Sequence, residues 1–171
     1  PDHRTTRLPI RTASFVLTGI VLLGGCAAQG AANGPASAAS TTFHAPQVGE
    51  RHLGRLRQLT FGGNNAEAYF SADGKWLTFQ RQQAVDAGCD QQFIMKTDGF
   101  SLKQISNGLG WTICGYFIEK DQRIIFSSTF RDDPACPVPP DRAQGYVWPL
   151  GRFELFTVKR DGTDLKQLTN T

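Results

Sequence analysis

Short stretches rich in apolar and aromatic residues recur from residue 68 onward. Ala68–Phe70 and Trp76–Phe79 flank Asp73-Gly74, a dipeptide whose glycine supplies the positive φ of a tight hairpin turn. Gln92–Met95 and Leu102–Ile105 follow, and the last of these alternates strictly. This pattern predicts four short antiparallel strands.

The same order returns further along the chain. The second set of predicted strands is Cys114–Phe117, Arg123–Ser127, Phe153–Val158 and Leu165–Leu168. Beyond the first 26 residues no segment has a helical period, so the sequence predicts an all-β fold.

A five-residue motif marks the outer strand of each unit. Leu56-Arg57-Gln58-Leu59-Thr60 recurs 46 residues later at 102–106 and again 63 residues after that at 165–169. A repeat near 40–45 residues made of short strands is typical of a four-stranded propeller blade. The extra length of the second unit falls in 129–152, where the density of prolines predicts an inserted loop instead of a strand.

The order of these motifs resembles the WD40-like repeat of TolB-type β-propellers over residues 55–171. The hairpin of that family usually has Ser-Pro-Asp-Gly, whereas this chain has Ala72 in place of the proline. The second hairpin, Ile118–Gln122, lacks both the Ser and the Gly. The resemblance implies an incomplete propeller at 51–171, with two blades and the start of a third. We therefore expect the chain to be a piece of a longer protein and 51–171 alone to aggregate or fold marginally.

The N-terminal quarter has the layout of an export signal. Arginines precede an apolar run in residues 1–26, and that run is shorter than the roughly 20 residues of a transmembrane helix. Leu23-Gly24-Gly25-Cys26 resembles the lipobox of bacterial lipoproteins, which implies acylation of Cys26. Ala27 after the cysteine implies sorting to the periplasmic side of the outer membrane. An ordinary signal peptide with an incidental cysteine is the alternative. Residues 27–50 have the composition of a flexible linker.

Charge and motifs exclude several functions. The net charge is +3, and the signal region contributes much of it, so nothing indicates a nucleic-acid partner. His3, His44 and His52 lie outside the repeats, and no motif for a nucleophile, a metal or a phosphate is present. We expect no catalytic residue, no metal site and no cofactor within this chain.

Three cysteines remain after Cys26. In an oxidising compartment we prefer the pair Cys89–Cys114, because these residues belong to neighbouring blades. Cys136, in the insertion, is the alternative partner. No paired Cys or His spacing supports a zinc site.

Two further groups of residues have structural explanations. The turn aspartates are expected to cap their own backbone amides instead of binding a metal, and they are Asp73, Asp98, Asp121 and Asp161. The strand aromatics are expected to pack between blades, and they are Tyr69, Phe70, Trp76, Phe79, Phe93, Phe117 and Phe126. Trp111, Tyr146 and Trp148 are expected either to line a rim or to pack beneath the insertion.

The sequence favours a non-catalytic binding or scaffold protein of the cell envelope, held at the membrane by its lipid and presenting loops to a protein partner. The alternative is the propeller domain of a larger exported peptidase or hydrolase, since the resemblance includes propellers that stand beside such domains. A fold alone does not decide between them.

Overall fold

The computed structural model describes residues 43–84, 88–138, 141, 143, 145 and 151–171. The chain divides into two units, Pro1–Ala32 and Asn33–Thr171, and all the described residues belong to the second. Within the described ranges the protein contains strands and turns but no helix, so no helix there is long and apolar enough to cross a membrane. The prediction of Cys26 lipidation lies outside the described residues, as do the signal peptide and most of the linker.

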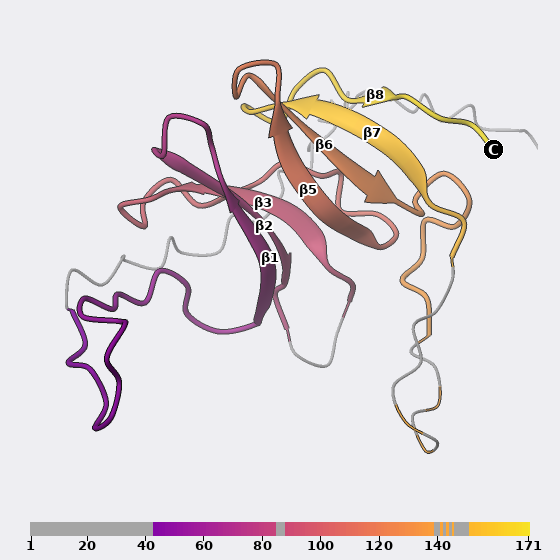
Figure 1. Ribbon diagram of the computed structural model, residues 1–171. Coiled ribbons are helices and arrows are strands. Elements are labelled where there is room, and N and C mark those ends of the chain that lie inside the picture. Colours follow the sequence, from indigo (N-terminus) through magenta and orange to yellow (C-terminus); the bar gives the residue numbers. More distant parts are fainter. Residues whose placement is uncertain (1–42, 85–87, 139–140, 142, 144, 146–150) are drawn as a thin grey trace, which may run out of the picture. The chain divides into compact units, whose positions relative to one another are not determined.

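Eight strands form two four-stranded antiparallel sheets (Figure 1). The first sheet consists of β1 (Asn64–Phe70), β2 (Trp76–Gln82), β3 (Gln91–Lys96) and β4 (Lys103–Gln104). The second consists of β5 (Thr112–Ile118), β6 (Arg123–Ser128), β7 (Glu154–Lys159) and β8 (Lys166–Gln167). In each sheet every strand pairs with the next along the chain, which confirms the predicted all-β class and the four-stranded repeat.

The inner strands β1 and β5 begin earlier than predicted because each contains a bulge. The register shifts between Ala66 and Tyr69 in β1 and between Ile113 and Tyr116 in β5. A non-glycine residue with positive φ lies in each bulge, Glu67 at 50° and Cys114 at 55°. The bulges therefore occupy equivalent places in the two repeats, where alternation gives no sign of them.

The core lies between the two sheets. Ile94 and Ile105, from the first repeat, pack against residues of the second sheet. There the rings of Phe126 and Phe156 stack 6.0 Å apart. Side chains alternate across a strand, so the other face of the first sheet carries its own cluster, Leu77, Phe79, Phe93 and Met95. Leu59, from the chain before β1, packs over that cluster.

Polar side chains fix the contact between the sheets. Gln80 Oε1 accepts from the backbone N–H of Cys114 across the two sheets at 3.2 Å, and within the first sheet Gln92 Nε2 donates to Thr78 Oγ1 at 2.7 Å. Gly115 leaves the room that Gln92 occupies, because a Cβ on this glycine would lie 2.2 Å from Gln92 Cδ. The two sheets can approach closely only while residue 115 lacks a side chain.

The two hairpin turns differ as their sequences do. Gly74 has φ of 66° in the first, as the Asp-Gly pair predicts. In the second, Glu119, Lys120 and Asp121 all have positive φ without a glycine. The carboxylate of Asp121 accepts from the N–H of Ala72 at 3.0 Å, so it joins the two turns.

Predictions for individual side chains had mixed outcomes. Asp73, Asp98 and Asp161 accept from the backbone N–H two residues ahead, as expected. Self-capping by Asp121 is wrong, because its carboxylate faces the neighbouring sheet. Among the aromatics, Phe70 is 66% exposed instead of packed between blades, and Phe79 and Phe93 lie in the cluster on the other face of the first sheet.

Candidate functional site

The described part of the insertion, 129–152, is tied to the first sheet at its base. Cys136 forms a disulfide with Cys89, with 5.5 Å between the Cα atoms. The N–H of Gly110 donates to the carbonyl of Pro134 at 2.8 Å. The carbonyl of Thr129 accepts the N–H groups of two aspartates and closes the first turn of the loop. The entry to the loop is therefore held in a defined place.

The preferred disulfide Cys89–Cys114 is wrong, and the alternative partner Cys136 is the correct one. Cys89 lies in the loop at the end of β2, whereas Cys114 lies within β5, in its bulge, and remains an exposed free thiol. Loss of hydration raises the pKa of the Cys114 thiol, and the nearby Glu67 carboxylate adds to the effect. The thiol is therefore protonated near neutral pH and a poor nucleophile.

Trp111 packs beside the insertion. Its ring lies 5.7 Å from the ring of Phe153, and its Nε1 donates to Asp90 Oδ2 at 3.1 Å. Burial raises the pKa of Asp90, and the hydrogen bond from Trp111 opposes that rise. Of the two alternatives for Trp111, these contacts favour packing. Tyr146 and Trp148 lie outside the described residues.

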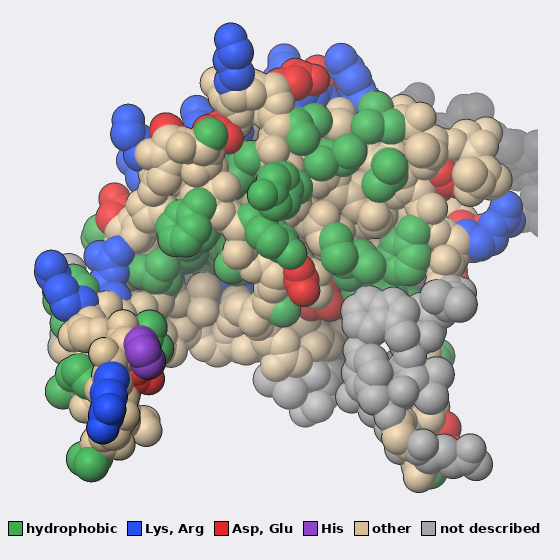
Figure 2. Space-filling view, viewed as in Figure 1, with side chains coloured by type: hydrophobic (Ala, Val, Ile, Leu, Met, Phe, Trp, Pro, Cys, Tyr) green, Lys and Arg blue, Asp and Glu red, His purple; other side chains and the backbone are tan. Residues whose placement is uncertain are grey.

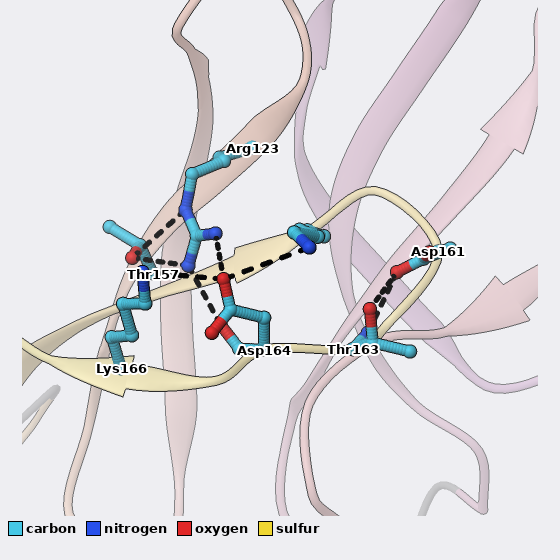
Figure 3. Close-up of polar contacts among 7 residues, drawn as sticks. Arg123, Thr157, Asp161, Thr163, Asp164 and Lys166 are labelled. Carbon is cyan, nitrogen blue, oxygen red and sulfur yellow. Dashed lines mark hydrogen bonds and ion pairs between the residues drawn. The ribbon is translucent and has the colours of Figure 1, made fainter.

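A cluster of charged side chains lies at the end of the second sheet away from the insertion, where the hairpin turns are (Figure 3). The nearly buried Arg123 donates from Nη1 to Asp164 Oδ2 at 2.9 Å and from Nη2 to Thr157 Oγ1 at 2.9 Å. Lys166 and Lys159 approach the same carboxylate oxygen, at 3.3 and 3.9 Å. The hydrogen bond from Arg123 is the main reason that the pKa of Asp164 is lowered.

This cluster fixes the outer part of the blade. Asp164 belongs to the turn between β7 and β8, and Arg123 begins β6, so the ion pair spans the sheet. In the same turn Asp161 accepts from the Thr163 hydroxyl at 2.6 Å and from the Thr163 N–H at 2.9 Å, and these two bonds lower the pKa of Asp161. The donors and acceptors satisfy one another, which is the arrangement of a structural network.

The face of the second sheet that points away from the first is open. Phe126 faces the core, so its neighbour Ile125 points the other way. The cross-strand partner of Ile125 is Tyr116, whose ring also lies 5.0 Å from the ring of Tyr69 in β1. Leu155, opposite Ser127, shares this face. Tyr116 is 53% exposed and Leu155 38%. Figure 2 shows apolar side chains gathered on the viewed side of the molecule, below Lys and Arg side chains at the turn end.

No metal-binding cluster is found among the described residues. They contain no group of three or more His, Cys, Asp or Glu side chains placed to hold a metal ion. His44 and His52 are exposed and precede the first sheet. The other surface features are the anchored insertion and the open face.

The chain forms two consecutive four-stranded antiparallel sheets that pack face to face and are built from one sequence repeat. This arrangement is that of β-propeller blades, so the fold belongs to the β-propeller class. No protein-family profile matches the chain, and no curated protein sequence matches it significantly. The chain is similar to a solved structure of a protein assigned as TolB from Agrobacterium tumefaciens, with 21% identity and a TM-score of 0.46. The match covers 67% of this chain and 35% of that one, so the chain spans about a third of its length.

Proposed function

We propose that this protein is a non-catalytic binding or scaffold protein of the cell envelope, which contacts a protein partner through the insertion 129–152. The anchoring of the insertion is the observation that carries the proposal. Loops longer than about 12–15 residues are uncommon in compact domains and are often functional.

The anchors suit a contact surface. The disulfide of Cys136 and the bond from Gly110 to Pro134 hold the first half of the loop, and Arg152 at its end approaches Asp132 with 3.4 Å between Nη1 and Oδ1. A loop held in place loses less conformational entropy when it binds. Val138, beyond these anchors, is 87% exposed and offers an apolar contact.

Site-specific photo-crosslinking in the native host tests the proposal. A photoreactive residue at Val138 is expected to give one discrete adduct with an envelope protein. The matched control is Phe100, which is also exposed and apolar but lies in the turn after β3, at the other end of the sheet. Absence of an adduct at Val138, or equal adducts at both positions, would contradict the proposal.

The lipid anchor is part of the same proposal. Acylation of Cys26 and a flexible linker at 27–50 would hold the blades at the periplasmic side of the outer membrane. Metabolic labelling with a fatty-acid analogue is expected to mark the wild-type protein and not Cys26→Ser. Labelling of both proteins would refute the lipid anchor.

The choice between a scaffold and a hydrolase is tested separately. A catalytic domain encoded after Thr171 would favour the hydrolase, and its absence would favour the scaffold.

A further inference from the structure

The five-residue motif that occurs three times in the chain belongs to a sheet only twice. Its second and third copies contain β4 and β8, the outer strands that pair with β3 and β7. The first copy, Leu56–Thr60, belongs to neither sheet. In the described structure its backbone takes part in one β-bridge, between Leu56 and His44. The first copy is thus an outer strand without the rest of its blade.

The side chains of the first copy nevertheless lie as they do in the other copies. Leu59 packs against the apolar cluster of the first sheet, as Ile105 packs against that of the second. The basic residue of the motif donates to a carbonyl in the turn between the last two strands of the covered sheet, and these bonds join Arg57 to Thr97 and Lys103 to Asp161. The glutamine Nε2 donates to the carbonyl two residues ahead in Gln58, Gln104 and Gln167.

The N–H of the fourth motif residue bonds an outer strand to its sheet. Ile105 donates to the carbonyl of Gln92 at 2.9 Å, and Leu168 donates to the carbonyl of Leu155 at 2.8 Å. The N–H of Leu59 has the equivalent place, but it donates to no backbone carbonyl of the described residues. The first copy therefore presents a donor to a strand of the kind that β3 and β7 represent.

The bridge to His44 does not use this donor. It is formed by the carbonyl of Leu56, which accepts from the N–H of His44 at 2.8 Å. In an extended chain, the backbone polar groups of residues three positions apart point to opposite edges. The edge of the segment that carries the N–H of Leu59 therefore has no described strand beside it.

The second sheet has the complementary surface. Its open face carries Ile125 and Leu155, and β8 leads into Leu168, the equivalent of Ile105. Ile105 is 4% exposed because the second sheet covers it, whereas Leu168 is 54% exposed. The chain thus has an outer strand without a sheet before β1 and an uncovered sheet after β5.

We propose that these two features meet in a head-to-tail assembly of copies of this chain. Leu56–Thr60 of one copy replaces Leu165–Thr169 beside β7 of the next copy. The first sheet of the one copy then covers the open face of the other copy's second sheet, as the second sheet covers the first within a chain. Burial of that apolar face stabilises the contact.

A second copy is the partner that the sequence favours. The segment that already pairs with β7 differs from Leu56–Thr60 at one position, where Lys166 corresponds to Arg57. The exchanged strand therefore offers the same backbone groups and the same apolar side chains to β7. Because the two contacting surfaces differ, the assembly grows into closed rings or open filaments instead of stopping at a symmetric dimer.

Proline substitutions in the two motif copies test the exchange, because they should act in opposite directions. Leu59→Pro removes the N–H that the assembly needs and is expected to weaken association at least tenfold. Leu168→Pro removes the bond to the carbonyl of Leu155, so it loosens the strand that must leave, and it is expected to strengthen association at least tenfold. Sedimentation velocity of the protein over a concentration series measures both.

Alanine variants are the matched controls, since Leu59→Ala and Leu168→Ala keep the N–H and should each change association less than threefold. If Leu59→Pro does not fold, the sign of the Leu168→Pro effect decides. Unchanged association in a folded Leu59→Pro protein, or unchanged or weaker association in Leu168→Pro, would overturn the proposal.

A wild type that stays monomeric would also overturn the second copy as the partner. In that case a peptide of residues 153–159, which contains β7, is the probe for another source of the strand. A saturable shift of the Leu59 amide signal in nuclear magnetic resonance with this peptide would assign the edge to a strand of another polypeptide.

Discussion

Asp164 is the residue on which the outer part of the second blade depends. Its carboxylate receives Arg123 from the start of β6 and Lys166 from β8, so one side chain connects two strands of the sheet. Without the Asp164 carboxylate, the buried guanidinium of Arg123 would have only neutral acceptors such as the hydroxyl of Thr157. A buried charge that loses its partner is destabilising.

Asp164→Asn is therefore expected to lower stability at neutral pH. The pKa of Asp164 is lowered from 3.8, chiefly by the hydrogen bond from Arg123, so the ionised carboxylate stabilises the folded state above 3.8. That contribution disappears as the pH falls through the lowered value. Urea midpoints should differ between wild type and variant at pH 7 and converge below pH 3.8.

Asp98→Asn is the control for that series. Asp98 caps the corresponding turn of the first sheet through one oxygen, which an asparagine retains. Its midpoint should stay near the wild type at every pH. A gap for Asp164→Asn that persists unchanged in acid would contradict the account.

Gly115 gives a second prediction at the residue scale. Gly115→Ala is expected to destabilise the protein by about 1–3 kcal/mol, because the new Cβ would overlap the amide of Gln92, which is fully buried between the sheets. Gly54→Ala is the matched control, since a Cβ there meets nothing within 4 Å. Thermal melts of both variants test this, and equal midpoints would contradict it.

At the scale of elements, the insertion is joined to the first sheet by one covalent bond. Cys89 and Cys136 are 47 residues apart, so the bond restricts a long segment of the unfolded chain.

The double variant Cys89→Ser/Cys136→Ser is expected to lose about 2–4 kcal/mol of unfolding free energy, as is typical when a native disulfide is removed. Cys114→Ser changes an exposed thiol and should have little effect. Urea denaturation under non-reducing conditions measures both. A Cys114→Ser protein as unstable as the double variant would contradict the pairing.

The strands show what local pattern can predict. All eight predicted strands form, because alternation and the spacing of turn residues are local properties. The bulges at Glu67 and Cys114 were not predicted, since neither residue type signals a positive φ. The turn at Lys120 also lacks a glycine, and the bond from Ala72 to Asp121, 49 residues apart, accompanies its shape.

At the scale of the whole molecule, the open face of the second sheet is uncovered apolar surface. The two blades are built from the same strands. On the first blade, the equivalent face is covered by the second blade. Leu155 is 38% exposed in the described structure, and Tyr116 is 53% exposed although its ring lies 5.0 Å from that of Tyr69 in β1. Exposed apolar faces of sheets favour association.

We therefore expect the protein to associate at micromolar concentrations and Leu155→Lys to reduce that association. Val138→Lys, a charge added at an exposed apolar residue of the insertion, is the control and should not reduce it. Analytical ultracentrifugation compares the three proteins. A wild type that sediments as a monodisperse monomer and melts cooperatively would contradict this expectation.

The sequence by itself determined the strands, their grouping by four and the place of the insertion, because period-two alternation, Asp-Gly turns and prolines act on neighbouring residues. Only the tertiary structure decided that Cys89 pairs with Cys136 and that Asp121 bonds across to Ala72. Each of these depends on the distance between residues far apart in the chain. That distance is set by the packing of one sheet on the other and by the position of the insertion against the first sheet. No local sequence pattern encodes it.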